Sequence, residues 1–262
     1  MSTDFLYGQS EILILLALFG MLLLACEAGF QLGRRNKPPE QVRAHISNIE
    51  GALLGLFALL LGFTFAMALS RFELRRQMVV QEANAIGTAA LRARLLPADE
   101  RAEVTEMFRR YVAIRLAAAS GPNLPSPEHR ELDAEAGRLQ EQLWLKASAA
   151  AEADTRSVPA GLLLQAMNQL IDIKGERDAS LANRVPESVL MLLFGFAVLT
   201  SGVLGFANGL AGARTMGTVA ILSVLICLVM LVIIDLDRPR RGLIRVSQDS
   251  MIAVQKTLDA QK

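Results

Sequence analysis

The chain has 262 residues and a mass of 28.4 kDa, is 52% hydrophobic but only 5% aromatic, and carries a formal net charge of +1. Its apolar residues concentrate near the two ends, in long runs almost free of charge, whereas residues 71–185 hold 16 basic and 16 acidic residues. This distribution excludes a simple soluble globular protein. No segment combines basic with aromatic residues, so a nucleic-acid-binding surface is excluded as well.

Four apolar stretches have the length of membrane helices, since a hydrocarbon core of about 30 Å takes roughly 20 residues of helix. The stretches are Ile12–Phe30, Gly51–Ser70, Val189–Leu210 and Thr218–Ile234. They predict two membrane helices, an insert and two further membrane helices. The expected parts of the chain are 12–70 with the first two helices and their loop, 71–185 as the insert, 186–234 with the last two helices, and 235–262 as a charged C-terminal segment.

The basic residues next to these stretches indicate the orientation, because Lys and Arg concentrate in cytoplasmic segments. With the N-terminus in the cytoplasm, eight of the flanking basic residues are cytoplasmic and five are external. Arg34, Arg35 and Lys37 belong to the five and oppose this orientation. The balance favours cytoplasmic N- and C-termini and a cytoplasmic insert.

The second membrane helix is expected to continue into the insert as far as Pro97, because residues 70–96 contain no proline and only one glycine. Apolar residues recur there at helical spacing and predict a buried face, formed by Phe72, Val79, Ala83, Ile86 and Ala90. Polar residues are assigned to the opposite arc: Arg71, Arg75, Glu82, Asn84, Thr88 and Arg92. This arc is interpreted either as a solvated face or as a polar seam against another helix or subunit.

The rest of the insert has helical periodicity, with helices expected from Asp99 to Ser120, from Pro127 to Ala153 and from Pro159 to a stop near Pro186. Alternating strand patterns with hairpin turns are missing from the sequence. A short amphipathic helix that contains Met251 and Leu258 is expected near the C-terminus. The sequence therefore predicts an all-α integral membrane protein with four transmembrane helices and a helical insert.

Polar residues at the ends of the membrane helices are candidates for functional groups. Glu27 lies near the end of the first helix, where it either reaches water or Arg34 or acts as a buried functional acid. Asp235 and Asp237 end the fourth helix, where carboxylates oppose the helix dipole. Local arginines such as Arg238, a bound cation or the arginines after the second helix would each offset these charges.

Small residues are frequent in the second and third membrane helices. They are Gly51, Gly55, Gly62, Gly195, Gly202 and Gly205. Such residues let helix backbones approach closely, so they predict tight packing between membrane helices.

The sequence has no pattern that is typical of an enzyme or of a cofactor-binding site. Cys26, Cys227, His45 and His129 lack neighbours at metal-ligand spacing. Neither a metalloprotease motif nor a Ser/His/Asp set that helical spacing would bring together is present. We therefore expect a non-enzymatic protein without a cofactor.

The second helix resembles the bestrophin family in Leu61-Gly62-Phe63 and in Ser70-Arg71-Phe72-Glu73 followed by Arg75. Asp237-Arg238-Pro239 is similar to the acidic residue and proline that follow the last membrane helix of that family. Over nearly the whole chain, the sequence resembles more closely the bacterial bestrophin-like integral membrane proteins. The residues that carry this resemblance are Glu82-Ala83-Asn84-Ala85-Ile86-Gly87-Thr88 and Asp235-Leu236-Asp237-Arg238-Pro239.

The resemblance implies a homopentamer with a cytoplasmic helical domain and a central ion pore lined by the second helix, with anions favoured. The apolar neck of that pore would fall on Gly55, Leu59 and Phe63, although Gly55 stands where a bulky residue is expected. Glu73 likewise replaces an aromatic residue of the family pattern. Eukaryotic relatives bind calcium through a run of acids after the last helix, where this chain has two aspartates.

Two hypotheses about function remain. The first is an oligomeric ion channel of the bacterial inner membrane, in which Leu59 and Phe63 form an apolar gate; the same residues could instead pack against helices or face lipid. The second is a non-conducting membrane scaffold or sensor whose helical domain binds a protein partner. Candidate members of a structural or gating polar network are Glu27, Arg71, Arg75, Glu82, Asn84, Thr88, Asp235, Asp237 and Arg238. The expected partners are the lipid bilayer, further copies of the chain and inorganic ions.

Overall fold

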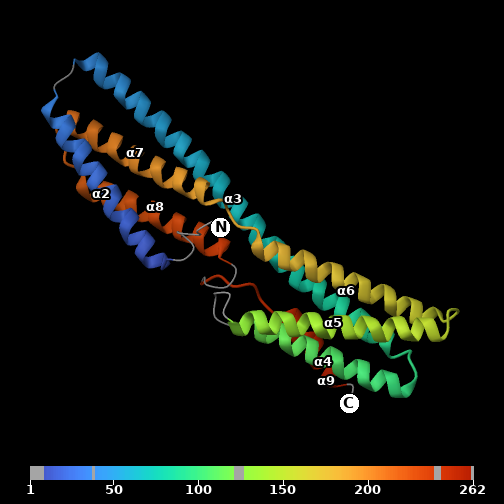
Figure 1. Cartoon of the computed structure of the whole chain (residues 1–262). Helices are drawn as coiled ribbons and strands as arrows, with labels where there is room; N and C mark the ends of the chain where they lie inside the picture. The colour runs from blue at the N-terminus through green and yellow to red at the C-terminus, as the bar shows by residue number, and fades with distance from the viewer. Residues whose placement is uncertain (1–8, 37–38, 121–126, 239–242, 261–262) are drawn as a thin grey trace. The chain divides into compact units, whose positions relative to one another are not determined.

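A computed structural model describes residues 9–36, 39–120, 127–238 and 243–260. Throughout these ranges the regular secondary structure is helical (Figure 1). The helices are α2 (Glu11–Arg35), α3 (Glu40–Ala93), α4 (Ala98–Ser120), α5 (Pro127–Ala153), α6 (Val158–Ala182), α7 (Glu187–Ala211), α8 (Met216–Asp237) and α9 (Asp249–Asp259). The predicted all-α fold is confirmed.

Four helical stretches of the described chain are long and apolar enough to cross a membrane, which confirms the four predicted membrane helices. Three of them, α2, α7 and α8, extend a few residues beyond the apolar runs. The second stretch belongs to α3, which has 54 residues and begins at Glu40, eleven residues before Gly51. The apolar run marks only the middle of this helix, because helical structure continues into polar sequence on both sides.

Residues Met1–Arg71 and Arg184–Arg238 form one compact unit, in which α2 packs against α7 and α8. Glycines bring the backbones of α2 and α7 into direct contact. A methyl group on Gly29 would overlap the carbonyl oxygen of Gly202, and one on Gly205 would overlap the carbonyl oxygen of Cys26. Ser201 Oγ also donates a hydrogen bond of 2.8 Å to the carbonyl oxygen of Leu22. Close backbone packing of this kind is how small residues stabilise helix pairs in membranes.

The other four glycines do not pack closely against a second helix of the described chain. For them the prediction of tight packing is wrong within a single chain. A methyl group added to Gly195 of α7, or to Gly51, Gly55 or Gly62 of α3, would meet nothing within 4 Å. The small residues of α3 point away from the other helices of their own chain, so intramolecular packing does not require them.

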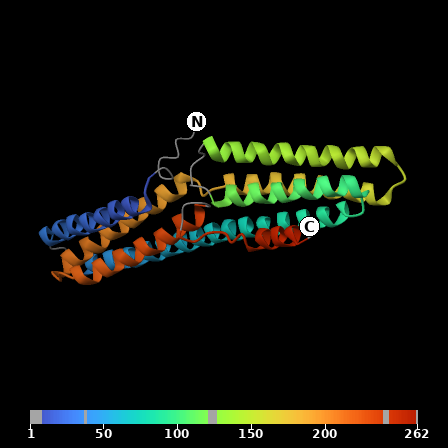
Figure 2. The ribbon, with the colours of Figure 1, turned by 90° about the horizontal axis from the view of Figure 1, so that it is seen from below.

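The second compact unit comprises Phe72–Asn183 and Pro239–Lys262. Figure 2 shows α4, α5 and α6 running alongside the second half of α3. Its core includes Ile86 of α3, Phe108 of α4, Leu143 of α5, Leu163 of α6 and Met251 of α9, each at most 1% exposed. Apolar periodicity thus gives each of these helices a buried face.

The C-terminal helix α9 is an integral part of this unit. Met251 and Leu258 are buried in the same core. Nε and Nη2 of Arg109 on α4 both donate to the carbonyl oxygen of Leu258, at 3.0 and 2.9 Å. A cation at a helix C-terminus satisfies carbonyl groups that have no partner within the helix.

The glycine contact yields a prediction with a matched control on the same helix. Gly205→Ala should destabilise the protein by about 1–3 kcal/mol, because the new methyl group forces two backbones apart. Gly195→Ala should be neutral or stabilising by about 0.5–1 kcal/mol, since its methyl group has room and alanine favours helix. Thermal unfolding of the detergent-solubilised variants measures the difference. Equal melting temperatures would show that α2 and α7 are not held by this contact.

Candidate functional site

The three candidate pore residues share one exposed face of α3. Gly55 is exposed, and the side chains of Leu59 and Phe63 are 53% and 64% exposed. On the opposite side of the helix Phe57, Thr64 and Ala68 are buried. The structure therefore brings the candidates onto one surface and directs that surface away from the helices of their own chain.

Two further candidates, Asn84 and Thr88, are also exposed. Glu82 and Arg75 are buried, with exposed fractions of 0% and 2%. The interpretation of these polar residues as one arc opposite the core is thus wrong for Glu82 and Arg75. Glu82 follows Val79 by three residues, so helical geometry places it on the buried face. The polar residues of α3 therefore belong to two different surroundings.

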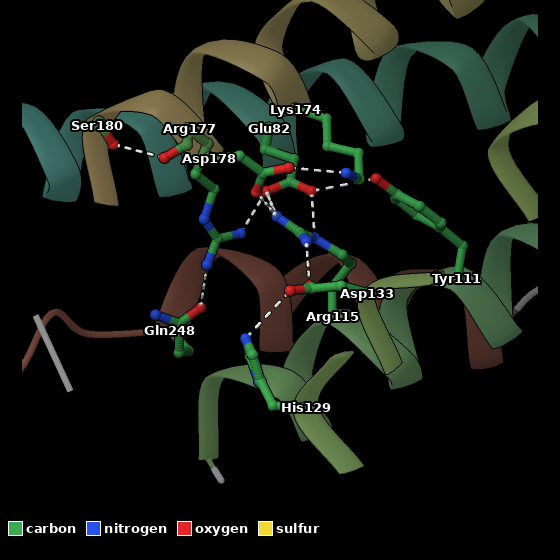
Figure 3. Close-up of polar contacts among 10 residues, drawn as sticks. All are labelled: Glu82, Tyr111, Arg115, His129, Asp133, Lys174, Arg177, Asp178, Ser180 and Gln248. Atoms are coloured by element: carbon green, nitrogen blue, oxygen red, sulfur yellow. Dashed lines mark hydrogen bonds and ion pairs between the residues drawn. The ribbon is translucent and has the colours of Figure 1, made fainter. Parts of the chain in front are cut away.

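A cluster of charges surrounds the carboxylate of Glu82 inside the second unit (Figure 3). Arg115 of α4 donates from Nε to Oε1 at 2.7 Å and from Nη2 to Oε2 at 3.2 Å. Arg177 of α6 donates from Nη1 to Oε2, and the hydroxyl of Tyr111 lies 3.3 Å from Oε1. One carboxylate on α3 thereby binds α4 and α6 through charge-assisted hydrogen bonds.

The buried charges influence one another. Burial alone would raise the pKa of Glu82, but the guanidinium groups of Arg115 and Arg177 hold this pKa below its ordinary value. Burial and the adjacent carboxylate raise the pKa of Tyr111 above its ordinary value. Burial opposes the charge of Arg115, yet Glu82 raises the pKa of this guanidinium. Glu82 is accordingly ionised and Tyr111 neutral at physiological pH.

Further polar groups extend the cluster to α5 and to the start of α9 (Figure 3). Arg115 lies 3.6 Å from Asp133, whose other oxygen is 3.1 Å from Nε2 of His129. Asp178 lies 3.8 Å from Arg115 and 2.7 Å from Lys174. Nη2 of Arg177 is 3.4 Å from Oε1 of Gln248. Among the described residues, the cluster thus joins α3, α4, α5 and α6 and reaches Gln248, the residue before α9.

Arg75 binds the end of α6. Its Nε and Nη2 donate to the carbonyl oxygens of Ser180, at 3.3 Å, and Asn183, at 2.8 Å. The buried guanidinium therefore serves as a C-terminal cap for α6. Arg71, one turn earlier on α3, is half-buried.

The acidic end of α8 makes contacts within the first unit. Oδ2 of Asp237 accepts a hydrogen bond of 2.9 Å from the backbone N–H of Val185, and Asp235 is 2% exposed. Arg238 forms an ion pair of 3.3 Å with Glu11 at the start of α2. These contacts pair Arg238 with Glu11 and Asp237 with a backbone N–H, so the alternatives for the charges of the two aspartates stay predictions. Within the described chain no three His, Cys, Asp or Glu residues are grouped closely enough to hold a metal ion.

Glu27 is at the opposite end of α2. Its carboxylate lies 3.4 Å from Arg214 and 3.1 Å from Nε2 of Gln31, and Arg214 also lies over the ring of Phe30 at 5.6 Å. Arg214 is a partner that the sequence did not indicate, in addition to the expected Arg34, whose charge also acts on Glu27. This contact fastens the segment between α7 and α8 to the end of α2.

The sequence pattern over most of the chain matches a known family. The family model of the Bestrophin-like domain matches residues 14–251. The chain belongs to the Bestrophin-like family. A search of the curated proteins finds no match.

Solved structures share the fold. A variant of a bacterial Bestrophin homolog from Klebsiella pneumoniae is similar with a TM-score of 0.71 and 16% identity, over 95% of this chain and 97% of that one. A second variant of this homolog has a TM-score of 0.66 and 19% identity, and the match covers 95% of this chain and 98% of that one. A structure described as a membrane protein has a TM-score of 0.70 and 18% identity, and the match covers 95% of this chain and 98% of that one. These likenesses show the fold, and the family match together with the four apolar helices makes the chain a Bestrophin-like membrane protein.

The Glu82 cluster predicts a stability change that depends on pH. Glu82→Gln should cost about 3–5 kcal/mol at neutral pH, because two buried guanidinium groups lose their carboxylate. Since folding lowers the pKa of Glu82, its contribution is complete above the unfolded value of about 4.3 and is lost as the pH falls through the folded value. The variant should therefore lose less stability than the wild type on acidification.

Chemical unfolding between neutral and acidic pH, followed by circular dichroism, measures both effects. Glu73→Gln is the control, because the Glu73–Arg76 pair is exposed on the same helix and such pairs contribute little. If Glu82→Gln behaved like this control, the two guanidinium groups would not depend on the carboxylate of Glu82.

Proposed function

We propose that the protein is an oligomeric ion channel of the bacterial inner membrane, in which copies of α3 surround a central pore. The observation that carries this proposal is a set of exposed residues on α3, in one run that ends at Ser70 and a second that begins at Gln77, with the half-buried Glu73 between the two runs. Its members recur at helical spacing and are each exposed in one chain: Gln41, His45, Asn48, Ala52, Gly55, Leu59, Phe63, Ala66, Ser70, Gln77, Gln81, Asn84 and Thr88. We call this set the pore face.

The polarity of the pore face changes twice along the helix. From Gln41 to Asn48 it is polar, from Ala52 to Ala66 it is apolar, and from Ser70 to Thr88 it is polar again. A lipid-facing surface would account for the apolar part alone, whereas a pore needs water-compatible entrances on both sides of a constriction. The pattern therefore supports a wide polar passage on each side of an apolar neck.

The neck would gate conduction by excluding water. Leu59 and Phe63, repeated around a symmetry axis, would form successive apolar rings, and hydrophobic constrictions close by dewetting. Gly55 makes the neck wider at its outer end than a bulky residue would.

The pore face carries little charge. Its entrances are formed by amide and hydroxyl groups and by the imidazole of His45, and Glu73, which lies between Ser70 and Gln77 at helical spacing, is paired with Arg76 at 3.4 Å. Conduction would then depend on dipoles and pore radius more than on rings of fixed charge. Family resemblance favours anions, and bestrophin resemblance favours a pentamer with cytoplasmic termini and a cytoplasmic insert.

The alternative is a non-conducting scaffold or sensor, and one surface of the helical unit favours it. An open groove of about 730 Å³ lies between α4 and α5. Met107, Leu139 and the 54% exposed Leu145 line it, together with Glu103 and Lys146. Such a groove could receive a partner protein whether or not the membrane helices conduct.

Two substitutions in the neck should change ion flux in opposite directions. Leu59→Ser should increase flux from liposomes, because a hydroxyl group hydrates the ring, and Gly55→Leu should decrease it by narrowing the neck. Leu16→Ser on α2 is the control, since Leu16 is 67% exposed on a different helix. Chloride and potassium gradients measured separately would identify the ion. Unchanged flux in both neck variants, with the oligomer intact, would place the pore elsewhere.

Cysteine labelling tests the orientation. Arg34→Cys and Glu128→Cys place one thiol at the end of α2 and one at the start of α5. In intact cells, after the outer membrane is made permeable, an impermeant maleimide should label only the first. Labelling of Glu128→Cys alone would reverse the proposed topology.

A further inference from the structure

The outer part of the pore face contains a side chain whose charge changes near neutral pH. Among the residues of the pore face, only His45 carries a group of the kind that takes up a proton between about pH 5 and pH 8. Its neighbours on this face, Gln41 and Asn48, carry amide groups that keep no charge at any of these pH values. The pH of the solution therefore changes the charge of the pore face at His45.

His45 lies on a part of α3 that the other described helices of the chain leave uncovered. Within residues 40–50 of this helix, only Ile46 and Glu50 are half-buried, and the other side chains, that of His45 included, are exposed. The imidazole is thus open to the surrounding solution, from which both protons and permeating ions reach it.

The charged residues of the same segment lie on other sides of the helix. They are Glu40, Arg43 and Glu50. With about 100° between consecutive helical residues, the two glutamates are about 140° away from His45 around the axis, and Arg43 is about 160° away. These carboxylates therefore do not face the imidazole. In the proposed channel, the titratable groups that face it at the same level are the His45 side chains of the further copies.

We infer that His45 sets the preference of the channel for anions over cations according to the pH on the outer side of the membrane. The inference rests on the proposed function, in which the pore faces of all copies surround one axis. Each copy then contributes one imidazole to a ring at the outer entrance. Protonation on acidification makes this ring positive, which raises the local concentration of anions and lowers that of cations.

The ring of His45 side chains acts at the entrance and not at the neck. His45 precedes Gly55, the first residue of the neck, by about 15 Å along the helix. Charges in water that are farther apart than about 8 Å are largely screened at physiological ionic strength. The imidazoles therefore influence which ions enter, whereas Leu59 and Phe63 determine whether the neck conducts. The influence of the ring should weaken as the salt concentration rises.

Single-channel recordings of the full-length protein in planar bilayers provide the test, because each side can be acidified separately. Acidification of one side from about pH 8 to about pH 5 should raise the chloride-to-potassium permeability ratio about two- to tenfold, and acidification of the other side should not. His45→Gln should keep a low ratio at both pH values, and His45→Lys a high one. Arg43→Gln is the control, since it also removes positive charge from this segment but lies off the pore face, so the pH dependence should remain.

Two results would overturn the inference and leave the proposed channel intact: a parent that conducts with a ratio independent of pH, or a pH dependence that persists in His45→Gln. If the parent passes no ions, the proposed channel fails and the inference fails with it. Helical circular dichroism and the assembled mass in detergent show whether the variants fold as the parent does. If His45→Gln does not fold, His45→Lys decides, because a pH-dependent ratio in that variant would equally overturn the inference.

Discussion

The structure depends on one helix, α3, whose parts lie in three different environments. With 54 residues, α3 is about 81 Å long at 1.5 Å per residue, far more than the roughly 30 Å of a hydrocarbon core. Its middle has to tolerate lipid or other helices, its ends have to tolerate water, and all three parts belong to one helix. Every functional assignment in this protein follows from how those three parts are supported.

Support for the second half of α3 comes from charge. Glu82 has no exposure to solvent, yet it holds guanidinium groups from α4 and α6, and Arg75 caps the last turn of α6. Buried ion pairs add little net stability, because desolvation offsets most of the attraction. Their geometric demand is strict, however, so the cluster fixes which way α3 is rotated about its axis. In the proposed channel, that rotation decides which residues of the second half of α3 are exposed, among them Asn84 and Thr88.

Sequence patterns predicted much of the fold because membrane spans and helical periodicity are local properties. The apolar runs located α2, α7 and α8, and the lack of proline after Ser70 predicted the length of the second half of α3. The start at Glu40 was missed, because the polar residues before Gly51 give no apolar signal. Glu82 was selected, but its partners Arg115 and Arg177 are 33 and 95 residues away. Only the packing of helices brings such residues together, and no local pattern encodes it. Arg214 and Glu11 were missed for the same reason.

The construction of the helical unit has a consequence for biosynthesis. Its core combines residues 72–183 with α9, and Met251 and Leu258 belong to that core although both last membrane helices lie between the two parts of the chain. During translation the first part leaves the ribosome well before α9 does. The unit can complete its core only after α7 and α8 have been synthesised. Final compaction of this domain therefore follows the synthesis of the last membrane helices, so chains that stop early leave an open apolar surface for quality control to recognise.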